Sequence, residues 1–367
     1  MRLPEGRLRV PGSPKRRGSR VLVALSGGVD STVAAALMLA EGHEVVGITL
    51  DQWAGPGCPS PVEPARRAAD QLGIEFEVLD CRAPFLAGVV GAFGASYLAG
   101  STPNPCVVCN RTIRFPTLLA EASRLGCNLV ITGHHARVQA SRGGWRLLRA
   151  TDEVKDQSYF LHTLGQADLG RVRFPVGGMT KSEVRALARS LGLTAASEVE
   201  SQDLCFIGPE GYRAFLMARF PEAARPGPVV DLDGSEIGRH QGTVGYTVGQ
   251  RRGLGIAMGE PRFVVEVRPD SATVVVGGAA DLLSAGCRVV GVSFVSGNPP
   301  GDLLVEVKVR YRSPGVPARL EAGEAGEWLV SFDRPQAAVT PGQAAVFYRG
   351  DEVLGGGTIL AVQRLRV

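Results

Sequence analysis

Six residues near the N-terminus, Ser-Gly-Gly-Val-Asp-Ser at 26–31, form a glycine turn between an apolar run and a helix-periodic segment. Two glycines let the backbone approach an anion closely, and the following helix offers unpaired N–H groups and a positive dipole end to a phosphate. The common nucleotide loop G-x-x-x-x-G-K-[ST] uses a lysine to reach the outer phosphates, and this turn contains none. The turn therefore predicts phosphate binding without transfer of a γ-phosphate. The alternative is an ordinary strand-to-helix turn.

The seven cysteines are the second group of residues with possible chemistry. An odd number, without a secretion signal, argues against a structural disulfide framework. Cys106 and Cys109 form a C-x-x-C pair next to two prolines, and we expect 102–110 to be a stiff loop because proline disfavours helix. The pair could be half a zinc site, iron–sulfur ligands, a redox pair or a coincidence of packing. No second C-x-x-C or paired-histidine motif follows, which disfavours structural zinc.

Three further groups of residues have less specific patterns. His134 and His135 follow an apolar run, and they are candidates for substrate contact or, equally, for solvated side chains. Cys205, taken alone, is typical of a buried cysteine. Thr180 and Glu183 form a capping box that starts a helix through Leu191, and we interpret this helix as structural.

The elements that must position these residues alternate between strand and helix. Apolar and periodic runs indicate strands and helices in turn, at 21–25, 32–40, 44–50, 63–72, 74–79 and 129–132. Such alternation predicts a parallel sheet, whose ligands bind beyond the carboxyl ends of the strands. The loops at 26–31 and 50–53 would then meet, with Leu50 beside an adenine. The alternative for 50–53 is a surface loop with an exposed Trp53.

The second half of the chain has a different character. From Pro221 onward, proline and glycine concentrate and short alternating runs replace helices. Val305, Val307 and Val309 alternate with charged residues, which is the period-2 pattern of a half-buried strand. Further runs of this kind, near the C-terminus, predict a small β-barrel there.

Length and charge limit the classes of function. The 367 residues predict two or three domains, and the net charge of +4 is compatible with an RNA partner but below that of a dedicated nucleic-acid binder. We expect residues 1–19, basic residues among prolines and glycines, to be a disordered tail rather than a signal peptide. No apolar run approaches the roughly 20 residues of a membrane-spanning helix, so we expect a cytoplasmic protein without a membrane partner.

Six motifs, in this order, resemble those of tRNA-specific 2-thiouridylases, which belong to the ATP pyrophosphatase superfamily. They are Ser-Gly-Gly-Val-Asp-Ser, Thr-Pro-Asn-Pro-x-x-x-Cys-Asn, Thr-Gly-His, Lys-Asp-Gln-Ser-Tyr-Phe-Leu, Ser-Gln-Asp-x-Cys-Phe-Ile and Gly-Gln-Arg-Arg-Gly-Leu-Gly. The resemblance spans about residues 20–367. It implies an α/β fold: a doubly wound parallel-sheet ATP pyrophosphatase domain at 20–220, a small, mostly β, tRNA-binding domain at 221–280 and a β-barrel at 281–367.

The same resemblance implies an activity. ATP, with Mg²⁺ on its phosphates, would adenylate O2 of the wobble uridine in the anticodon stem-loop of tRNA, and sulfur would then replace that oxygen. Cys205 would carry the sulfur as a persulfide, loaded by a sulfur-donor protein. Cys109 would be the catalytic nucleophile and would close a transient disulfide with Cys205 as sulfur is released.

Residue matching to the family implies three sets of contacts. ATP would be bound by the loop and two residues at neighbouring strand ends: Ala24, Leu25, Ser26, Gly27, Gly28, Val29, Asp30, Ser31, Leu50 and Gly133. The target base would touch Asn104, Pro105 and Cys106. The tRNA would contact residues from both halves of the chain: His134, Lys155, Asp156, Gln157, Tyr311, Arg312 and Gln343.

Cys106 departs from the family pattern, because many relatives have an aspartate there. A thiol with a pKa near 8.5 is a poor substitute for a carboxylate in proton transfer. With Cys109 and Cys205 it could instead hold a [4Fe–4S] cluster, and we favour the persulfide route over this alternative. Two competing functions are an amide-forming synthetase with the same loop and a non-enzymatic RNA-binding module. The second of these would leave Cys109 and Cys205 without roles.

Overall fold

The computed structural model describes residues 18–55, 57–197, 204–256, 260–301 and 303–365. Most of the expected N-terminal tail lies outside this range. So do Ser201, Gln202 and Asp203, which belong to the motif that contains Cys205.

Five parallel strands form the sheet of the N-terminal region. Their order is β3 (Glu75–Asp80), β2 (Glu44–Asp51), β1 (Arg20–Ala24), β4 (Leu129–Ile131) and β7 (Val172–Arg173). Alternate residues of β1 point to opposite faces, so Val21 and Val23 join one core while Leu22 joins another. The sheet is therefore covered on both faces, as the alternating sequence pattern predicts.

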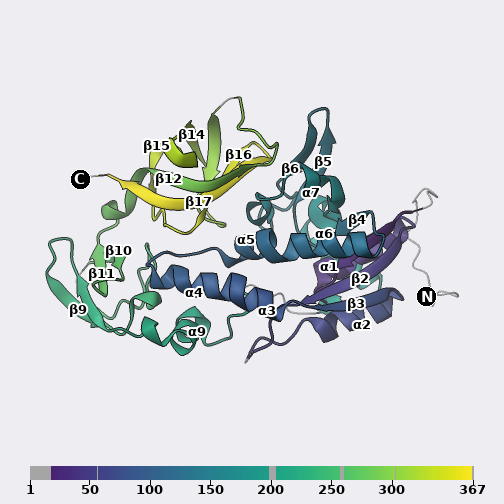
Figure 1. Cartoon of the computed structure of the whole chain (residues 1–367), viewed down its shortest axis with the longest axis horizontal. Helices are drawn as coiled ribbons and strands as arrows, with labels where there is room; N and C mark the ends of the chain where they lie inside the picture. The colour runs from purple at the N-terminus through teal and green to yellow at the C-terminus, as the bar shows by residue number, and fades with distance from the viewer. Residues whose placement is uncertain (1–17, 56, 198–203, 257–259, 302, 366–367) are drawn as a thin grey trace.

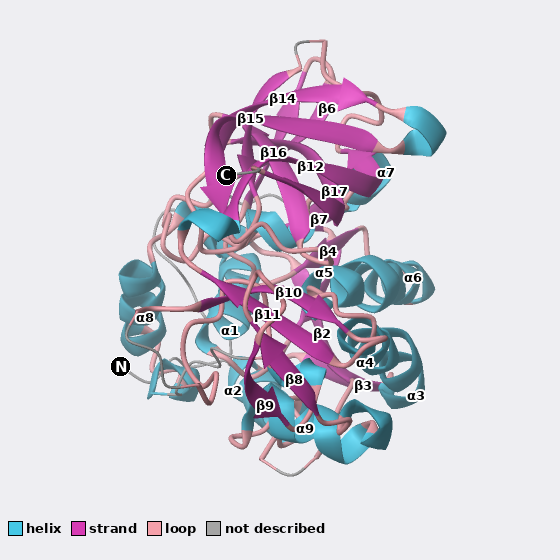
Figure 2. Ribbon diagram, turned by 90° about the vertical axis from the view of Figure 1, so that its left-hand side faces the viewer, coloured by secondary structure: helices cyan, strands magenta, loops and turns pink. Residues whose placement is uncertain are grey.

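Helices on the two faces come from different parts of the chain. The first face carries α1 (Val29–Ala40), α2 (Val62–Leu72) and α8 (Lys181–Ser190), whose apolar residues share one core with β1. The opposite face carries α6 (Phe115–Arg124) and α7 (Gln166–Arg171). Figure 2 shows the sheet between these two layers. The capping box of Thr180 and Glu183 is present at the start of α8.

A long helical segment leads from the sheet toward the middle of the molecule and back (Figure 1). Residues 82–98 are continuously helical, from α3 (Arg82–Phe85) through a π-helical turn to α4 (Gly91–Leu98). After a short extended stretch, α5 (Pro105–Cys109) begins and continues through residues 110–114 into α6.

The expectation of a stiff loop over 102–110 was wrong in its second half. Pro105 occupies the first helical position, where its missing N–H costs nothing, and its fixed φ suits a helix. Asn104 caps the helix by accepting a hydrogen bond from Val107 N at 3.3 Å. Cys106 and Cys109 therefore lie on one helical turn rather than on a loop.

The central region contains α9 (Gly211–Arg219) and a four-stranded sheet. The strand order is β10 (Phe263–Arg268), β11 (Thr273–Gly277), β8 (Gly227–Val230) and β9 (Glu236–His240). The turn at Asp233-Gly234 lies between β8 and β9, and Gly234 has a φ of +87°. Its own core contains Val229, Val264 and Val274.

Six antiparallel strands close into a barrel at the C-terminus. In order they are β12 (Leu283–Phe294), β15 (Trp328–Ala337), β14 (Val316–Ala322), β13 (Leu304–Lys308), β16 (Ala344–Arg349) and β17 (Glu352–Arg364), and β17 pairs back with β12. Val305, Val307 and Val309 are buried inside it, as their alternation predicts. The three-part α/β and β architecture implied by the sequence is confirmed.

The barrel and the N-terminal region share a sheet, which the sequence did not predict. The hairpin of β5 (Arg137–Ser141) and β6 (Gly144–Leu148) adds to the barrel, with Val353 of β17 opposite Leu147 of β6. An ion pair between Arg146 and Glu352, 2.7 Å long, lies at the same junction. The Arg149 guanidinium lies 3.9 Å from the centre of the Tyr348 ring.

No helix within the described parts of the chain is long and apolar enough to cross a membrane.

His162 is a buried histidine whose ring contacts the barrel, since a Cβ added at Gly356 would lie 2.8 Å from it. Burial lowers the pKa of His162 to about 4, against a hydrogen bond to Tyr159 O that favours the charged form. An unfolded histidine titrates near pH 6.5, so the folded state binds fewer protons between these values.

We therefore expect the free energy of unfolding to fall as pH drops from about 6.5 to about 4, by about 1.4 kcal/mol per pH unit for this group. Urea unfolding across this range would measure the slope. His162→Gln should reduce the slope of the free energy of unfolding against pH by about 1.4 kcal/mol per pH unit. A slope equal to that of the wild type would contradict the lowered pKa of His162.

Candidate active site

The glycine turn at 26–31 leads directly from β1 into α1. Gly28 is the N-cap of α1 and has no side chain to cap it, so first-turn N–H groups remain for a ligand. Gly27 has a φ of +78°, and a Cβ there would lie 2.3 Å from the side chain of Pro64. Ser31 Oγ accepts a hydrogen bond from Ser26 N at 3.2 Å and donates one to Gly28 O at 3.0 Å. These contacts hold the turn in a compact form suited to an anion.

The other residues expected around ATP lie along the same edge of the sheet. Gly133 comes two residues after β4. It packs against the start of α1, where a Cβ at this position would lie 2.5 Å from Ser31 N. Leu50, near the end of β2, is half-buried against the core below. The structure thus brings the contiguous segment 24–31 together with Gly133, and it places Leu50 at the end of the adjacent strand.

Lys181 reaches this loop from α8, and sequence reasoning missed it. Its Nζ lies 2.6 Å from Asp30 Oδ2, and His135 Nε2 lies 3.2 Å from Asp30 Oδ1. Burial raises the pKa of Asp30, but the hydrogen bonds from His135 and Lys181 outweigh it and leave the pKa below its usual range. The capping box gave α8 an adequate structural role, so nothing local distinguished its first residue as part of the site.

A loop next to these residues connects the turn to the segment expected to contact tRNA. Asp152 Oδ2 accepts a hydrogen bond from Lys181 N at 2.9 Å, and Asp152 Oδ1 accepts one from Lys155 N at 3.2 Å. Gln157 Oε1 accepts from His135 N at 2.9 Å, and Gln157 N donates to His135 O at 2.7 Å. The glycine turn and the segment 152–157 are therefore held in one hydrogen-bonded unit.

Asp156 is buried within this segment and bonds to the protein itself. Its carboxylate accepts hydrogen bonds from Ala150 N at 3.0 Å and from the Ser158 hydroxyl at 2.9 Å. We interpret Asp156 as a residue that shapes the loop.

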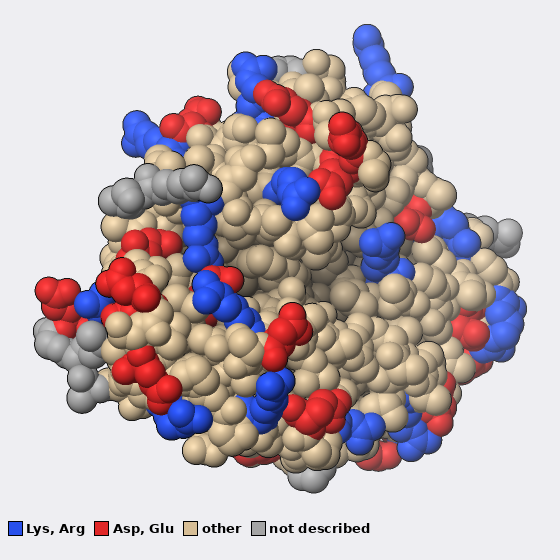
Figure 3. Space-filling model, turned by 60° about the vertical axis from the view of Figure 1, so that its left-hand side comes forward, with Lys and Arg blue, Asp and Glu red and all other residues tan. Residues whose placement is uncertain are grey.

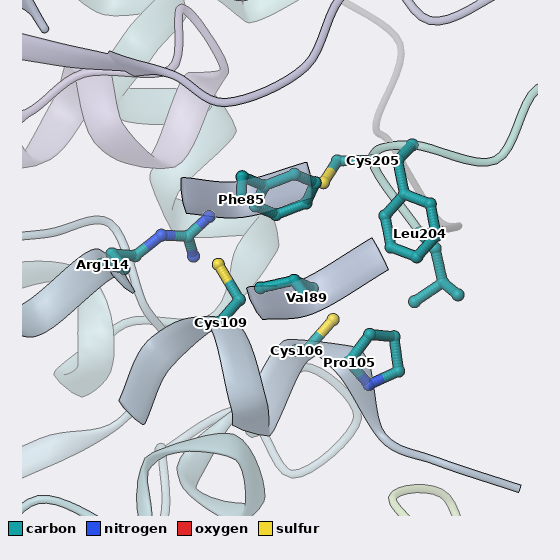
Figure 4. A pocket seen from close by; sticks show the side chains of 9 residues that line it. Phe85, Val89, Pro105, Cys106, Cys109, Arg114, Leu204 and Cys205 are labelled. Carbon is teal, nitrogen blue, oxygen red and sulfur yellow. The ribbon is translucent and has the colours of Figure 1, made fainter. Parts of the chain in front are cut away.

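Three cysteines meet around one pocket with about 300 Å³ of empty space, part of it open to solvent. Cys106 and Cys109 come from α5, and Cys205 enters from a distant part of the sequence. Figure 4 shows Cys109 between Arg114 and Val89, with the sulfur of Cys205 across the pocket beside Phe85. Cys109 is buried, and Gln52 Nε2 donates a hydrogen bond to its sulfur at 3.3 Å.

The surroundings affect the other two thiols in the same direction. Burial raises the pKa of Cys106, and Arg114 opposes this rise. Protein atoms around the sulfur raise the pKa of Cys205 to about 12, although the residue as a whole is exposed at the edge of the pocket. At neutral pH both side chains are therefore thiols rather than thiolates.

An aromatic cluster anchors the segment that carries Cys205. Phe206 is buried, and its ring lies 5.2 Å from that of Phe93 and 5.8 Å from that of Phe85. Trp53 also packs on Phe206, at 6.3 Å, so it is not the exposed tryptophan of a surface loop. The loop after β2 therefore faces the cysteines.

Cys106, Cys109 and Cys205 do not have the geometry of a metal site. Among the described residues, no three His, Cys, Asp or Glu side chains are grouped so that they could hold a metal ion. The arrangement therefore does not fit the three-cysteine ligand set of a cluster.

The residues expected to contact tRNA lie in different environments. His134 packs between Phe115 and Phe174, each ring 5.8 Å away, and burial lowers its pKa to about 3. Tyr311 stacks on Phe160 at 4.4 Å, and Arg312 is exposed. One face of the molecule is hollowed at its centre, with both basic and acidic side chains around the rim (Figure 3).

Gln343 and Asn104 are engaged within the protein. Gln343 Nε2 donates hydrogen bonds to Thr102 O at 2.9 Å and to Pro103 O at 3.2 Å. Asn104 caps α5, so its oxygen is committed to Val107 N.

Comparison with known proteins gives three family matches along the chain. A model described as the tRNA methyl transferase HUP domain matches residues 19–209, and the PRC-barrel domain of the same name matches 213–278. A model described as an aminomethyltransferase beta-barrel domain matches 284–359.

Curated relatives match nearly the whole chain. A tRNA-specific 2-thiouridylase MnmA from Chloroflexus aurantiacus is 48% identical over 352 residues, which covers 93% of this chain and 98% of that protein. The protein of the same name from Roseiflexus sp. (strain RS-1) is 47% identical over 371 residues, covering 93% and 99%. Among solved structures, a 4-thiouridine synthetase in complex with RNA and ATP matches at 16% identity and a TM-score of 0.36, covering 56% of this chain and 51% of that one.

Lys181→Met tests whether the lysine beside Asp30 belongs to the phosphate site. A charge-assisted hydrogen bond contributes about 1.5–3 kcal/mol, so we expect ATP affinity to fall about tenfold to a hundredfold. Isothermal titration calorimetry with ATP would measure the change. Arg189→Met, an exposed substitution in the last turn of α8, is the matched control. ATP affinity equal to that of the wild type would exclude Lys181 from the site.

Proposed function

This chain belongs to the tRNA-specific 2-thiouridylase family, and from that premise we propose which of its residues carry out each step. It is a tRNA sulfurtransferase that uses ATP to make 2-thiouridine. The matching models are described by methyl transfer, but such a reaction would need neither the phosphate-binding turn nor the paired cysteines. Neither an amide-forming synthetase nor a non-enzymatic RNA-binding module is favoured.

One observation carries the assignment of residues: Cys109 and Cys205, far apart in sequence, line the same pocket. Gln52, the residue directly after β2, bonds to Cys109, and the glycine turn follows the neighbouring strand β1. A nucleotide at the turn and a sulfur carrier at the pocket would therefore act on one substrate between them.

The first step is adenylation of the uridine. O2 of the wobble base attacks the α-phosphorus of ATP, pyrophosphate leaves, and the oxygen becomes part of a good leaving group. The N-terminus of α1 and the turn at 26–31 bind the phosphates, with Lys181 beside them. Mg²⁺ accompanies the phosphates. Leu50 and Gly133 complete the site around the nucleotide.

The second step transfers sulfur from a persulfide on Cys205. The terminal sulfur attacks C2 of the adenylated base, and AMP leaves with the original oxygen. Cys109 attacks Cys205 Sγ, so the persulfide S–S bond breaks and its electrons remain with the transferred sulfur. The enzyme ends with a Cys109–Cys205 disulfide, and a thiol reductant must supply two electrons before the next turnover.

The exposed edge of Cys205 supports loading by a sulfur-donor protein. The thiolate is the reactive form of cysteine, and the pKa of Cys205 near 12 leaves it protonated at neutral pH. Loading therefore requires that the donor, or a movement of the segment, relieve the burial of the sulfur. We place this reaction in the cytoplasm, where thiol reductants are available.

The tRNA contacts come from both the N-terminal region and the barrel. Removing the wobble base from its stack costs a few kcal/mol, which backbone contacts offset. Lys155, Tyr311 and Arg312 make these contacts, while the buried Asp156 and the packed His134 shape the surface. Pro105 and Cys106 lie at the pocket where the base would enter.

Single-turnover thiolation by cysteine variants tests the persulfide route. Cys109→Ser and Cys205→Ser should reduce the rate about a thousandfold or more, because each supplies a sulfur that no other group replaces. Cys106→Ser should stay within about tenfold of the wild type, because this thiol only lines the pocket.

The competing cluster route predicts a different pattern. Anaerobically purified wild-type protein would then hold about four irons, and Cys106→Ser would lose both iron and activity. Iron and sulfide analysis of the same preparations distinguishes the two routes, and the cluster pattern would overturn the persulfide proposal.

Arg312→Ala tests the RNA surface. Phosphate contacts release counterions, so we expect tRNA affinity to fall steeply with salt, and the slope of the logarithmic plot to decrease by about one in the variant. ATP affinity should not change. Arg66→Ala, on α2 and away from the barrel, is the control. Binding of tRNA that does not depend on salt would refute this surface.

A further inference from the structure

The C-terminal barrel touches the chain immediately before the cysteine helix. Residues 341–343, which lead from β15 into β16, contact Thr102 and Pro103, which lead into α5. Thr102 N donates a hydrogen bond to Pro341 O at 2.9 Å. Gln343 Nε2 donates to both Thr102 O at 2.9 Å and Pro103 O at 3.2 Å. We call these contacts the barrel latch.

The two segments also pack closely against each other at Gly342 and Thr102. Gly342 has a φ of +90°, and a Cβ at this position would lie 2.9 Å from Thr102 O and 3.0 Å from its carbonyl carbon. Only glycine adopts this conformation without strain and leaves room for the neighbouring backbone.

The barrel side of the latch is fixed by its own sheet. Gly342 N donates to Ile359 O at 2.8 Å, and Ile359 N donates to Gln343 O at 2.8 Å. The position of residues 102 and 103 therefore depends on the position of the barrel.

What the latch holds is the start of α5. This helix, Pro105–Cys109, is the first turn of the continuous helical segment 105–124, and the end of a helix frays unless its unpaired N–H groups are capped. Its beginning is defined by Asn104, whose side chain caps Val107 N, and Asn104 directly follows the two carbonyls that Gln343 binds. Cys106 and Cys109 follow Asn104 by two and five residues.

We propose that Gln343 and Gly342 are positioning residues, which hold α5 so that Cys109 points into the pocket shared with Cys205. An amide NH₂ group has two N–H donors, and two backbone carbonyls accept from Gln343. The contact to tRNA that the family resemblance implies for Gln343 would have to compete with this arrangement. The inference rests on the proposed role of Cys109.

Alkylation of Cys109 provides a direct measurement without ATP or tRNA. Cys109 is 5% exposed in the latched structure. Iodoacetamide labelling of tRNA-free protein, followed by peptide mass spectrometry, reports how often α5 opens. We expect Gln343→Glu to raise the labelling rate of Cys109 about tenfold, because a carboxylate of the same size cannot donate to the carbonyls.

Gly342→Ala tests the same latch by a different mechanism. The added Cβ pushes against Thr102 while the Gln343 amide is retained, and we expect the same rise in labelling. Gln336→Glu is the matched control, a glutamine of β15 whose Nε2 bonds to Arg334 O two residues away. Its labelling rate should equal that of the wild type. Cys287, fully buried in the barrel core, reports whether the barrel itself remains folded.

Thiolation and tRNA binding complete the test. In both latch variants we expect the single-turnover rate at saturating tRNA to fall about tenfold, and the dissociation constant for tRNA to stay within about twofold. If Gln343→Glu weakens tRNA binding but leaves the labelling rate of Cys109 unchanged, Gln343 is an RNA contact. That result would overturn the proposal. Labelling of Cys109 that rises only together with that of Cys287 would also overturn it, since the barrel would then have unfolded.

Different measurements test the proposed thiolation of tRNA and the positioning of α5 by the barrel. If the wild-type protein does not thiolate tRNA, the proposed function is wrong, whereas the labelling of Cys109 still decides whether the barrel positions α5.

Discussion

All five strands of the N-terminal sheet run parallel, so their carboxyl ends lie along one edge. Three segments of the candidate site depend on this constraint. The glycine turn follows β1, Gln52 follows β2, and Gly133 follows β4. Each crossover returns the chain through a helix on one face or the other, which leaves the loops at this edge free to carry functional residues. The nucleotide turn and the loop that bonds to Cys109 are neighbours for this reason.

A second constraint is the junction between the barrel and the sheet domain. The β5–β6 hairpin extends the barrel through β17, and ion pairs across the junction add to the shared strands. The latch at Gln343 lies on another part of the barrel. The barrel is therefore attached to the N-terminal region at two separate places. The C-terminal domain thereby contacts the segment that leads into α5, in addition to any surface it offers to RNA.

The surroundings of the three cysteines limit the reactivity of two of their thiols. Burial keeps Cys106 and Cys205 protonated, while Cys109 receives a hydrogen bond from Gln52 inside the pocket. Arg114, facing the same space, favours the charged form of both neighbouring thiols. Sulfur chemistry would then begin only when a donor or the tRNA changes this environment. The aromatic packing around Phe206 holds the segment that contains Cys205 in place.

The sequence alone determined the fold class and the nature of the chemistry. Strand and helix periodicities located the parallel sheet, and the glycine turn indicated an anion site, because these signals are local. It did not reveal that Lys181 contacts Asp30 or that Gln52 donates a hydrogen bond to Cys109. It also did not reveal that Gln343 donates hydrogen bonds to the residues before α5. Those pairs are separated by tens to hundreds of residues, and each side chain is unremarkable in its own segment. Only tertiary packing brings them together. Proline misled the prediction at 102–110 for a related reason: its effect depends on whether it stands at a helix start, and the Asn104 cap decides that.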